Sequence, residues 1–241
     1  MNTLIVSDVH LGSYYNRARE LSAFIRSASF GRLIILGDLF DKSHVVRLRE
    51  DEWDFLDLVR SMTLRSEIIW VEGNHDEGLY DTIPSLLNIR AVKELEWELN
   101  GKKLLAIHGH QFDKYCKNNN FLPSCAGWLY RSLRRIDLLI ERDMFHDLCF
   151  ENNTWKHSSS VVTDGAIAYG KNKGADFIFC GHTHRAANIR KNGVEYFNTG
   201  CWSDRHCHYV TVDSRGVSLR KFAEYGEVVK RGVQLAAQQA I

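Results

Sequence analysis

The stretch LIILGD, residues 33–38, decides the fold class of this chain, because a short apolar run ends directly in a glycine and a carboxylate. An apolar run of this length is typical of a buried strand. Two further runs have the same form: Thr3–Val6 precedes Asp8, and Ile68–Val71 precedes Asn74. Parallel strands end at a common edge of their sheet, so we expect the polar residues behind them to lie close together.

Helix-like segments separate these strands, around Tyr14–Ser29 and Leu48–Met62. In the second segment Trp53, Leu56 and Val59 recur at helical spacing. Strands that alternate with helices favour an α/β layered fold.

The second half of the chain is richer in hairpins. Asn100-Gly101 and Asn192-Gly193 are strong turn signals between short apolar runs. The segments that we expect to be strands are 95–99, 104–107, 176–180, 187–190, 194–198, 209–212 and 217–219. One sheet built from strand–helix–strand units and a second sheet rich in hairpins fit a sandwich with helices outside.

Residues 112–160 interrupt this scheme, because they contain neither a buried strand nor a ligand motif and have a helical pattern. Four apolar residues fall on one helical face: Leu129, Leu133, Ile136 and Ile140. We expect a helical cap insertion over 112–160, within a single domain of residues 1–241. An ordinary amphipathic surface helix is the alternative interpretation.

The bulk composition is that of a globular protein, with 44% hydrophobic and 25% charged residues among 241. A formal net charge of +1 argues against a general nucleic-acid binder. The six cysteines show no C-x-x-C spacing, which argues against a zinc ribbon, and Cys180 is expected in the core. We see no signal peptide and no apolar run approaching the roughly 18 residues of a membrane span. These features favour a cytoplasmic protein with reduced thiols.

Five short motifs supply oxygen and imidazole groups: Asp8-x-His10, Gly37-Asp38-x-x-Asp41, Gly73-Asn74-His75-Asp76, His108-Gly109-His110 and Gly181-His182-x-His184. Carboxylates, an amide and imidazoles together suit Mn, Fe or Zn better than Ca or Mg. Two such ions about 3.5–4 Å apart can clamp the attacking and leaving oxygens of a phosphoryl displacement. The motifs therefore predict a two-metal hydrolytic site.

The spacing of the motifs suggests individual roles. Asp38 is the best candidate for a bridge that gives one oxygen to each cation. Asp8 and His10 are two residues apart and would point the same way from an extended strand end. The pair His182 and His184 has the same spacing and could serve one metal each if the loop turns.

The residues next to these ligands have other expected roles. His75 could donate a proton to the leaving oxygen, with Asp76 beside it to orient the ring and raise its pKa. For Asp41 we favour a partner of the site or a cap of the following helix over direct ligation. His110 is open between support of the site and a structural role.

In this order the five motifs resemble the calcineurin-like metallophosphoesterases. The resemblance implies an α/β fold, a four-layer αββα sandwich of two mixed sheets. It implies two divalent metal ions as cofactors, with Mn²⁺ expected and Fe or Zn as alternatives. Matching residue by residue assigns Asp8, His10, Asp38 and His184 to one metal, Asp38, Asn74, His108 and His182 to the other, and His75 with Asp76 to catalysis.

Three features resemble the UDP-2,3-diacylglucosamine hydrolase branch of lipid A biosynthesis: the short length, the insertion after His108-Gly109 and the stretch Asn198-Thr199-Gly200-x-Trp202. In that branch a helical cap receives acyl chains and a pyrophosphate is cleaved. His75 and His110 replace an arginine and an aspartate of that branch, which indicates a related subfamily. Trp202 is open between stacking on a substrate ring and a core position.

The resemblance implies a phosphorylated small-molecule or nucleotide-lipid substrate. A phosphodiesterase or phosphatase for small soluble nucleotides is the alternative, and a non-catalytic scaffold is a third. Residues 114–142 are rich in arginine and lysine, which suits peripheral contact with an acidic membrane at its inner face. No nucleic-acid partner is expected, and the oligomeric state is open.

Overall fold

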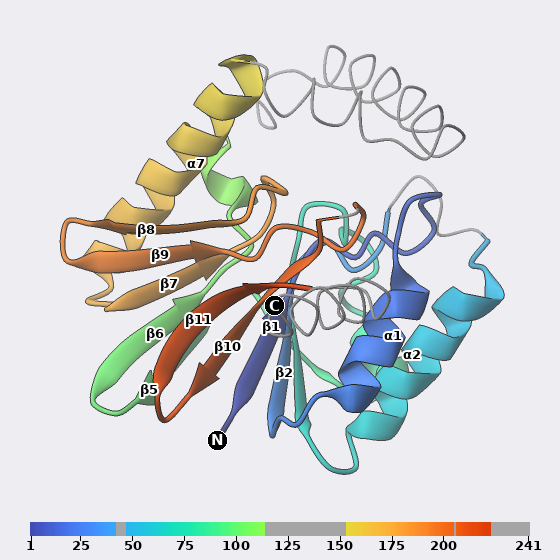
Figure 1. Ribbon diagram of the computed structural model, residues 1–241. Coiled ribbons are helices and arrows are strands. Elements are labelled where there is room, and N and C mark those ends of the chain that lie inside the picture. Colours follow the sequence, from blue (N-terminus) through green and yellow to red (C-terminus); the bar gives the residue numbers. More distant parts are fainter. Residues whose placement is uncertain (42–46, 114–152, 205, 223–241) are drawn as a thin grey trace, which may run out of the picture.

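The computed structural model describes residues 1–41, 47–113, 153–204 and 206–222 (Figure 1). The strands of its first sheet are β1 (Thr3–Val6), β2 (Arg32–Leu36), β3 (Glu67–Val71), β4 (Arg90–Val92), β10 (His208–Asp213) and β11 (Gly216–Lys221). They lie in the order β11-β10-β1-β2-β3-β4. β1 to β4 are parallel, and β10 pairs antiparallel with β1.

The strands of the second sheet are β5 (Leu95–Leu99), β6 (Lys102–Ala106), β7 (Phe177–Cys180), β8 (Ala187–Lys191) and β9 (Val194–Asn198). Their order is β5-β6-β7-β9-β8, with β6, β7 and β9 parallel. The hairpins β5–β6 and β8–β9 turn at Asn100-Gly101 and Asn192-Gly193, where all four residues have positive φ. That conformation is the reason for the Asn-Gly preference in two-residue hairpin turns, so both hairpin predictions are confirmed.

Helices cover the outer faces of both sheets (Figure 1). α1 (Ala18–Ser27) and α2 (Glu50–Met62) lie against the first sheet, and α7 (Asn153–Asn172) lies against the second. A short α3 (Ile83–Leu87) precedes β4, and a 3-10 turn η1 (His110–Phe112) follows β6.

Alternation along β2 shows how the layers are held together. Leu33 and Ile35 belong to the core beneath α1 and α2, whereas Ile34 and Leu36 belong to the core between the sheets. A third core joins the second sheet to Ile167 of α7. Because the inner strands β2, β3 and β7 pack into a core on both faces, they read as continuous apolar runs, whereas β5 and β11 alternate with exposed residues. Two mixed sheets with flanking helices, the four-layer sandwich, are therefore confirmed.

Two expectations change, and a third falls mostly outside the described residues. The hairpin β10–β11 belongs to the first sheet and not to the hairpin-rich sheet, since β10 pairs with β1. Leu56 and Val59 are buried on α2, but Trp53 is 57% exposed. Most of the predicted cap, including Leu129–Ile140 and the basic residues of 114–142, lies outside the described residues.

The thiol of Cys180 is fully buried in the core between β7 and α7, as expected. In the parts of the chain that the structure describes, no helix combines the length and apolarity needed to cross a bilayer.

Candidate metal centre

The five motifs meet at one edge of the sandwich, just beyond the strands that precede them. The side chains brought together come from the ends of five strands: Asp8 and His10 after β1, Asp38 after β2, Asn74 and His75 after β3, His108 after β6, and His182 and His184 after β7. Their ligand atoms form three overlapping groups, each within 4.8 Å. The convergence expected from parallel strand ends is present.

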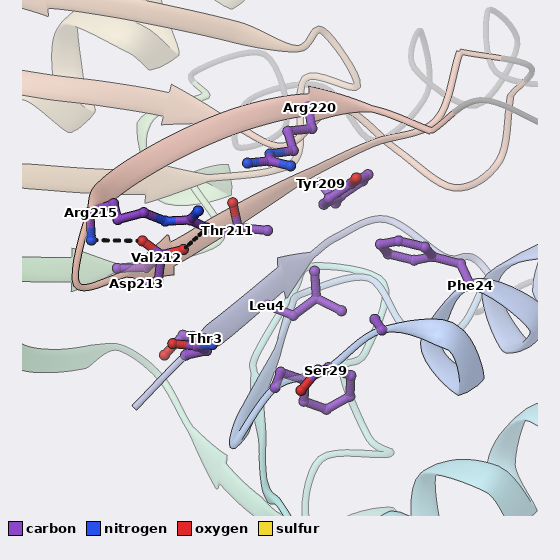
Figure 2. A pocket seen from close by; sticks show the side chains of 13 residues that line it. Thr3, Leu4, Phe24, Ser29, Tyr209, Thr211, Val212, Asp213, Arg215 and Arg220 are labelled. Atoms are coloured by element: carbon purple, nitrogen blue, oxygen red, sulfur yellow. Dashed lines mark hydrogen bonds and ion pairs between the residues drawn. The ribbon is translucent and has the colours of Figure 1, made fainter. Parts of the chain in front are cut away.

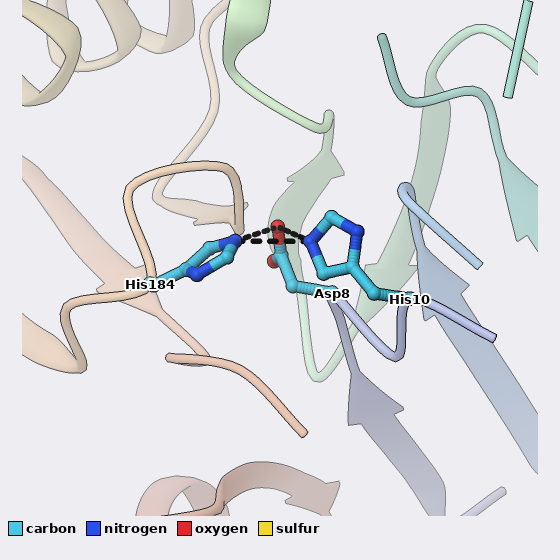
Figure 3. A group of neighbouring side chains, drawn as sticks. All are labelled: Asp8, His10 and His184. Carbon is cyan, nitrogen blue, oxygen red and sulfur yellow. Dashed lines mark hydrogen bonds and ion pairs between the residues drawn. The ribbon is translucent and has the colours of Figure 1, made fainter. Parts of the chain in front are cut away.

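The first group consists of Asp8, His10 and His184. Figure 3 shows both imidazoles pointing at the Asp8 carboxylate. The Nε2 atoms of His10 and His184 lie 3.1 Å apart, and His184 Nε2 lies 3.2 Å from Asp8 Oδ1. A zinc-like ion binds imidazole nitrogen at about 2.0–2.1 Å, so two nitrogens on one ion lie about 3 Å apart. The geometry fits one divalent cation.

The second group contains Asp38, Asn74, His108 and His182. Asn74 Oδ1 lies 3.2 Å from His108 Nε2 and 3.0 Å from His182 Nδ1. His108 Nε2 also lies 3.3 Å from Asp38 Oδ2. One carboxylate, one amide oxygen and two imidazoles thus face a common point and could hold a second cation.

Asp38 stands between the two groups. Its Oδ2 atom lies 3.9 Å from His10 Nε2 and 3.3 Å from His108 Nε2. The other oxygen, Oδ1, accepts a hydrogen bond of 2.9 Å from the backbone N–H of His75. The expected bridge would give one oxygen to each cation; here a single oxygen faces both groups.

The charges in the site also favour cations. Burial lowers the pKa of His108, but Asp38, Asp8 and the carbonyl oxygen of Leu36 together raise it to about 9. Burial lowers the pKa of His184 too, yet Cys201 and Asp8 raise it well above its ordinary value. The buried carboxylates of Asp8 and Asp38 are stabilised by positive charge nearby. In the metal-free protein protonated imidazoles supply this charge, and a bound divalent ion would supply it in their place.

Backbone strain is concentrated at these residues. Five candidate ligands have left-handed backbone: Asp8 (φ 53°), His10 (φ 52°), Asp38 (φ 50°), His182 (φ 65°) and His184 (φ 57°). The other non-glycine residues with positive φ in the described part of the chain are three asparagines, which tolerate it. Such conformations cost about 1–3 kcal/mol each and collect at functional sites. From the spacing we expected Asp8 and His10 to lie on an extended strand end. Their left-handed backbone shows that they do not.

The motif glycines allow the close approach of these elements. A Cβ atom on Gly73 would lie 2.2 Å from the backbone nitrogen of Asp38. A Cβ atom on Gly181 would lie 2.4 Å from Asp8 Oδ2, and neither glycine needs a positive φ. Both positions are thus closed to any side chain by contact with a candidate ligand.

His75 lies at the rim of the site with its side chain 37% exposed. Its ring is 4.9 Å from the ring of His10, and its Nδ1 atom is 3.6 Å from Asp41 Oδ1. Burial lowers the pKa of His75, but Asp41 and Asp38 together raise it above its ordinary value. Asp41, left open by the sequence, thus contacts the imidazole.

Asp76 has a different place from the one expected. Its carboxylate accepts hydrogen bonds from four N–H groups: the backbone of Asp38 (2.8 Å), Gly73 (2.9 Å) and Phe40 (3.2 Å), and Trp70 Nε1 (3.2 Å). The residue is fully buried. Asp76 therefore connects the two strand-end turns, and the carboxylate beside the His75 ring is that of Asp41.

One residue that contacts the site lies outside the five sequence motifs. Asp113 is buried at the end of η1, and its Oδ2 atom lies 3.1 Å from His182 Nε2. The ring of His110 lies beside the second group, 5.4 Å from the ring of His108 and 6.3 Å from that of His182. Trp202 is fully buried and packs on Phe24, so it is a core residue.

A separate cavity of about 280 Å³ lies between α1 and the β10–β11 hairpin (Figure 2). Its lining includes Phe24, Tyr209 and Arg220 and none of the candidate ligands.

One family model and one solved structure agree with this architecture. A family model described as calcineurin-like phosphoesterase matches residues 1–186. Among solved structures, the phosphoesterase Yfce from E. coli is 19% identical with a TM-score of 0.51, over 92% of this chain and 97% of that chain. A single mutant of Vps29 from Entamoeba histolytica is 12% identical with a TM-score of 0.48, over 92% of this chain and 98% of that chain. At these identities the likeness to Yfce concerns the fold, and no curated protein sequence matches the chain.

Proposed function

We propose that this chain, which belongs to the calcineurin-like phosphoesterase family, hydrolyses a phosphoester or pyrophosphate bond at a binuclear divalent metal site. The observation that carries the proposal is the convergence of candidate ligands on two adjoining groups, with Asp38 of the second group also facing His10 of the first. His10 and His184 direct two imidazole nitrogens at each other, 3.1 Å apart and beside the Asp8 carboxylate, which is the spacing of two nitrogens on one cation. Family and side-chain clusters together indicate the two-metal site.

The chemistry that two bound divalent ions supply is an activated water and neutralisation of charge on the phosphoryl group. The chain's own contribution begins with His75, the exposed imidazole beside the first group. With Asp41 at its Nδ1 atom, Nε2 is the ring nitrogen left to face a substrate. A protonated His75 would donate a proton to the leaving oxygen, which departs as an alcohol or phosphate.

The catalytic part of the proposal thus names His75 with Asp41 as its partner. Asp76 acts at a distance, by holding the backbone of Asp38 through a 2.8 Å hydrogen bond. Non-catalytic scaffolding is opposed by the presence of all seven candidate ligands and His75 together.

For the substrate we propose a nucleotide-linked pyrophosphate that carries acyl chains, similar to UDP-2,3-diacylglucosamine, with Mn²⁺ as the metal. This is supported by the resemblance in the sequence motifs and by the position of the insertion between the ligands His108 and His182. A small soluble nucleotide is the competing substrate class.

Hydrolysis by purified protein tests both levels. The substrates are bis(p-nitrophenyl) phosphate, p-nitrophenyl phosphate, a cyclic nucleotide and UDP-2,3-diacylglucosamine, each with and without Mn²⁺. We expect Mn²⁺-stimulated turnover, fastest on the nucleotide-lipid. Faster turnover of the cyclic nucleotide would favour a soluble nucleotide as the substrate. Purified protein that contains no bound metal and hydrolyses none of these substrates would refute the proposed function.

A further inference from the structure

The two ring nitrogens of His182 face different partners. Nδ1 lies 3.0 Å from Asn74 Oδ1, on the side of the second ligand group, and Nε2 lies 3.1 Å from Asp113 Oδ2. An ionised carboxylate only accepts hydrogen bonds, so His182 donates its Nε2–H to Asp113. The lone pair of the ring is then on Nδ1, the nitrogen that faces the candidate metal position.

His108 offers a comparison within the same site. Its Nδ1 atom lies 2.9 Å from the carbonyl oxygen of Leu36, which fixes the proton there and leaves Nε2 to face Asp38. A backbone carbonyl thus orients one imidazole of the second group, and a carboxylate side chain orients the other. Partners of this kind fix the tautomer and raise ligand basicity, and their loss commonly weakens metal binding about 10–100-fold.

Asp113 is also attached to the opposite end of the insertion. The hydroxyl of Ser158, on α7, donates to Asp113 Oδ2 over 3.3 Å. Three residues earlier on α7, Trp155 Nε1 donates to the carbonyl oxygen of Thr183 over 3.2 Å. Phe112 packs against α7 at Tyr169, with ring centroids 5.8 Å apart. η1 and α7 therefore lie together at the loop that carries His182 and His184 (Figure 1).

We propose that Asp113 is a positioning residue that orients His182 for the second metal, and that Trp155 holds the same ligand loop from α7. Asp113 thereby sets the affinity of the second metal position and not of the first, whereas the loop that Trp155 holds carries a candidate ligand of each metal. The proposal rests on the metal site of the proposed function but not on hydrolysis. Neither Asp113 nor Trp155 belongs to any of the five motifs.

Calorimetric titration of metal-free protein with Mn²⁺ tests this. Asp113→Asn keeps the shape of the side chain but removes the charge and lets the amide present its NH₂ to Nε2. We expect one of the two Mn²⁺ dissociation constants to rise about 10–100-fold and the other to change less than about twofold. Trp155→Phe keeps an aromatic side chain but loses the five-membered ring with its N–H, which bonds Thr183 between His182 and His184. Both dissociation constants should therefore rise by a smaller factor, about 2–5-fold.

Asp164→Asn is the matched control, because Asp164 lies on α7, is 54% exposed and pairs with Lys191 at 2.8 Å. It should leave both constants unchanged. A merely structural role for Asp113 would lower the melting temperature of the metal-free protein and leave both constants equal to wild type; that result overturns the proposal. Asp113→Glu, which restores the carboxylate, should recover part of the affinity and covers the case in which Asp113→Asn fails to fold.

Failure of this proposal is separable from failure of the proposed function. A wild-type protein that binds two Mn²⁺ without hydrolysing any phosphoester would contradict the enzyme and leave the affinity ratio to decide the role of Asp113. Wild-type protein that binds no Mn²⁺ would refute both.

Discussion

Replacement of Asp76 by alanine tests the assignment of this residue to the fold rather than to catalysis. The carboxylate accepts four N–H donors at 2.8–3.2 Å, and Asp76 has no exposed surface. Each buried donor left without an acceptor costs about 1–3 kcal/mol. Even at the lower limit the four together cost about 4 kcal/mol, against a total stability of about 5–15 kcal/mol.

The expected result for Asp76→Ala is a melting temperature about 8–16 °C below wild type, from about 2–4 °C for each kcal/mol in a chain of this size. Asp76→Asn should lose about half as much, because its amide oxygen can accept some of the four donors. Circular dichroism melts of metal-free protein measure both. Asp164→Ala is the control, since an exposed ion pair contributes about 0–1 kcal/mol. An Asp76→Ala protein that melts within about 2 °C of wild type but has lost turnover would refute the reasoning and return Asp76 to a direct role.

Three further predictions concern the site. Asp41→Asn should lower kcat about 10–100-fold with unchanged Mn²⁺ content, because Asp41 lies beside the His75 ring and belongs to none of the three candidate ligand groups. Loss of metal, measured by elemental analysis, would contradict this. Gly181→Ala should weaken Mn²⁺ binding in calorimetry, because its Cβ would lie against Asp8 Oδ2. Gly174→Ala strains a left-handed backbone (φ 71°) but meets no atom within 4 Å, so it should lower stability and retain Mn²⁺ binding. Mn²⁺ at about 100 times its dissociation constant should stabilise the folded protein by about 2.7 kcal/mol per site, and a melting temperature unmoved by Mn²⁺ or chelator would count against a native metal site.

The convergence of the ligands was predictable because apolar runs mark parallel strands, and parallel strands deliver the residues behind them to one edge. His108 follows β6 and His182 follows β7, and these strands are neighbours in the sheet even though more than 70 residues separate the two histidines. The four-layer arrangement was equally accessible, since runs such as Leu33–Leu36 are apolar on both faces.

What the sequence did not reveal depends on turn geometry and on distant pairing. Asp76 is next to His75 in the chain, but the turn directs its carboxylate to the backbone of Asp38 and Gly73, and Asp41 contacts the imidazole from another loop. The left-handed backbone of Asp8 and His10 could not be predicted from residue type, because Asp and His tolerate this conformation but adopt it in only a minority of positions. Likewise, no local pattern shows that β10 pairs with β1, because register between strands so far apart is set by the packed core.

The proposed function requires that two metals share Asp38 and that His75 acts on substrate beside them. Elemental analysis of Mn²⁺-loaded protein, combined with hydrolysis of bis(p-nitrophenyl) phosphate, tests it in wild type, Asp38→Ala and His75→Ala. We predict about two metals per chain in wild type and His75→Ala, with turnover lowered about 10²–10⁴-fold in the latter, and loss of both metals and of activity in Asp38→Ala. An Asp38→Ala protein that keeps two metals, or a His75→Ala protein that loses them, would contradict the account.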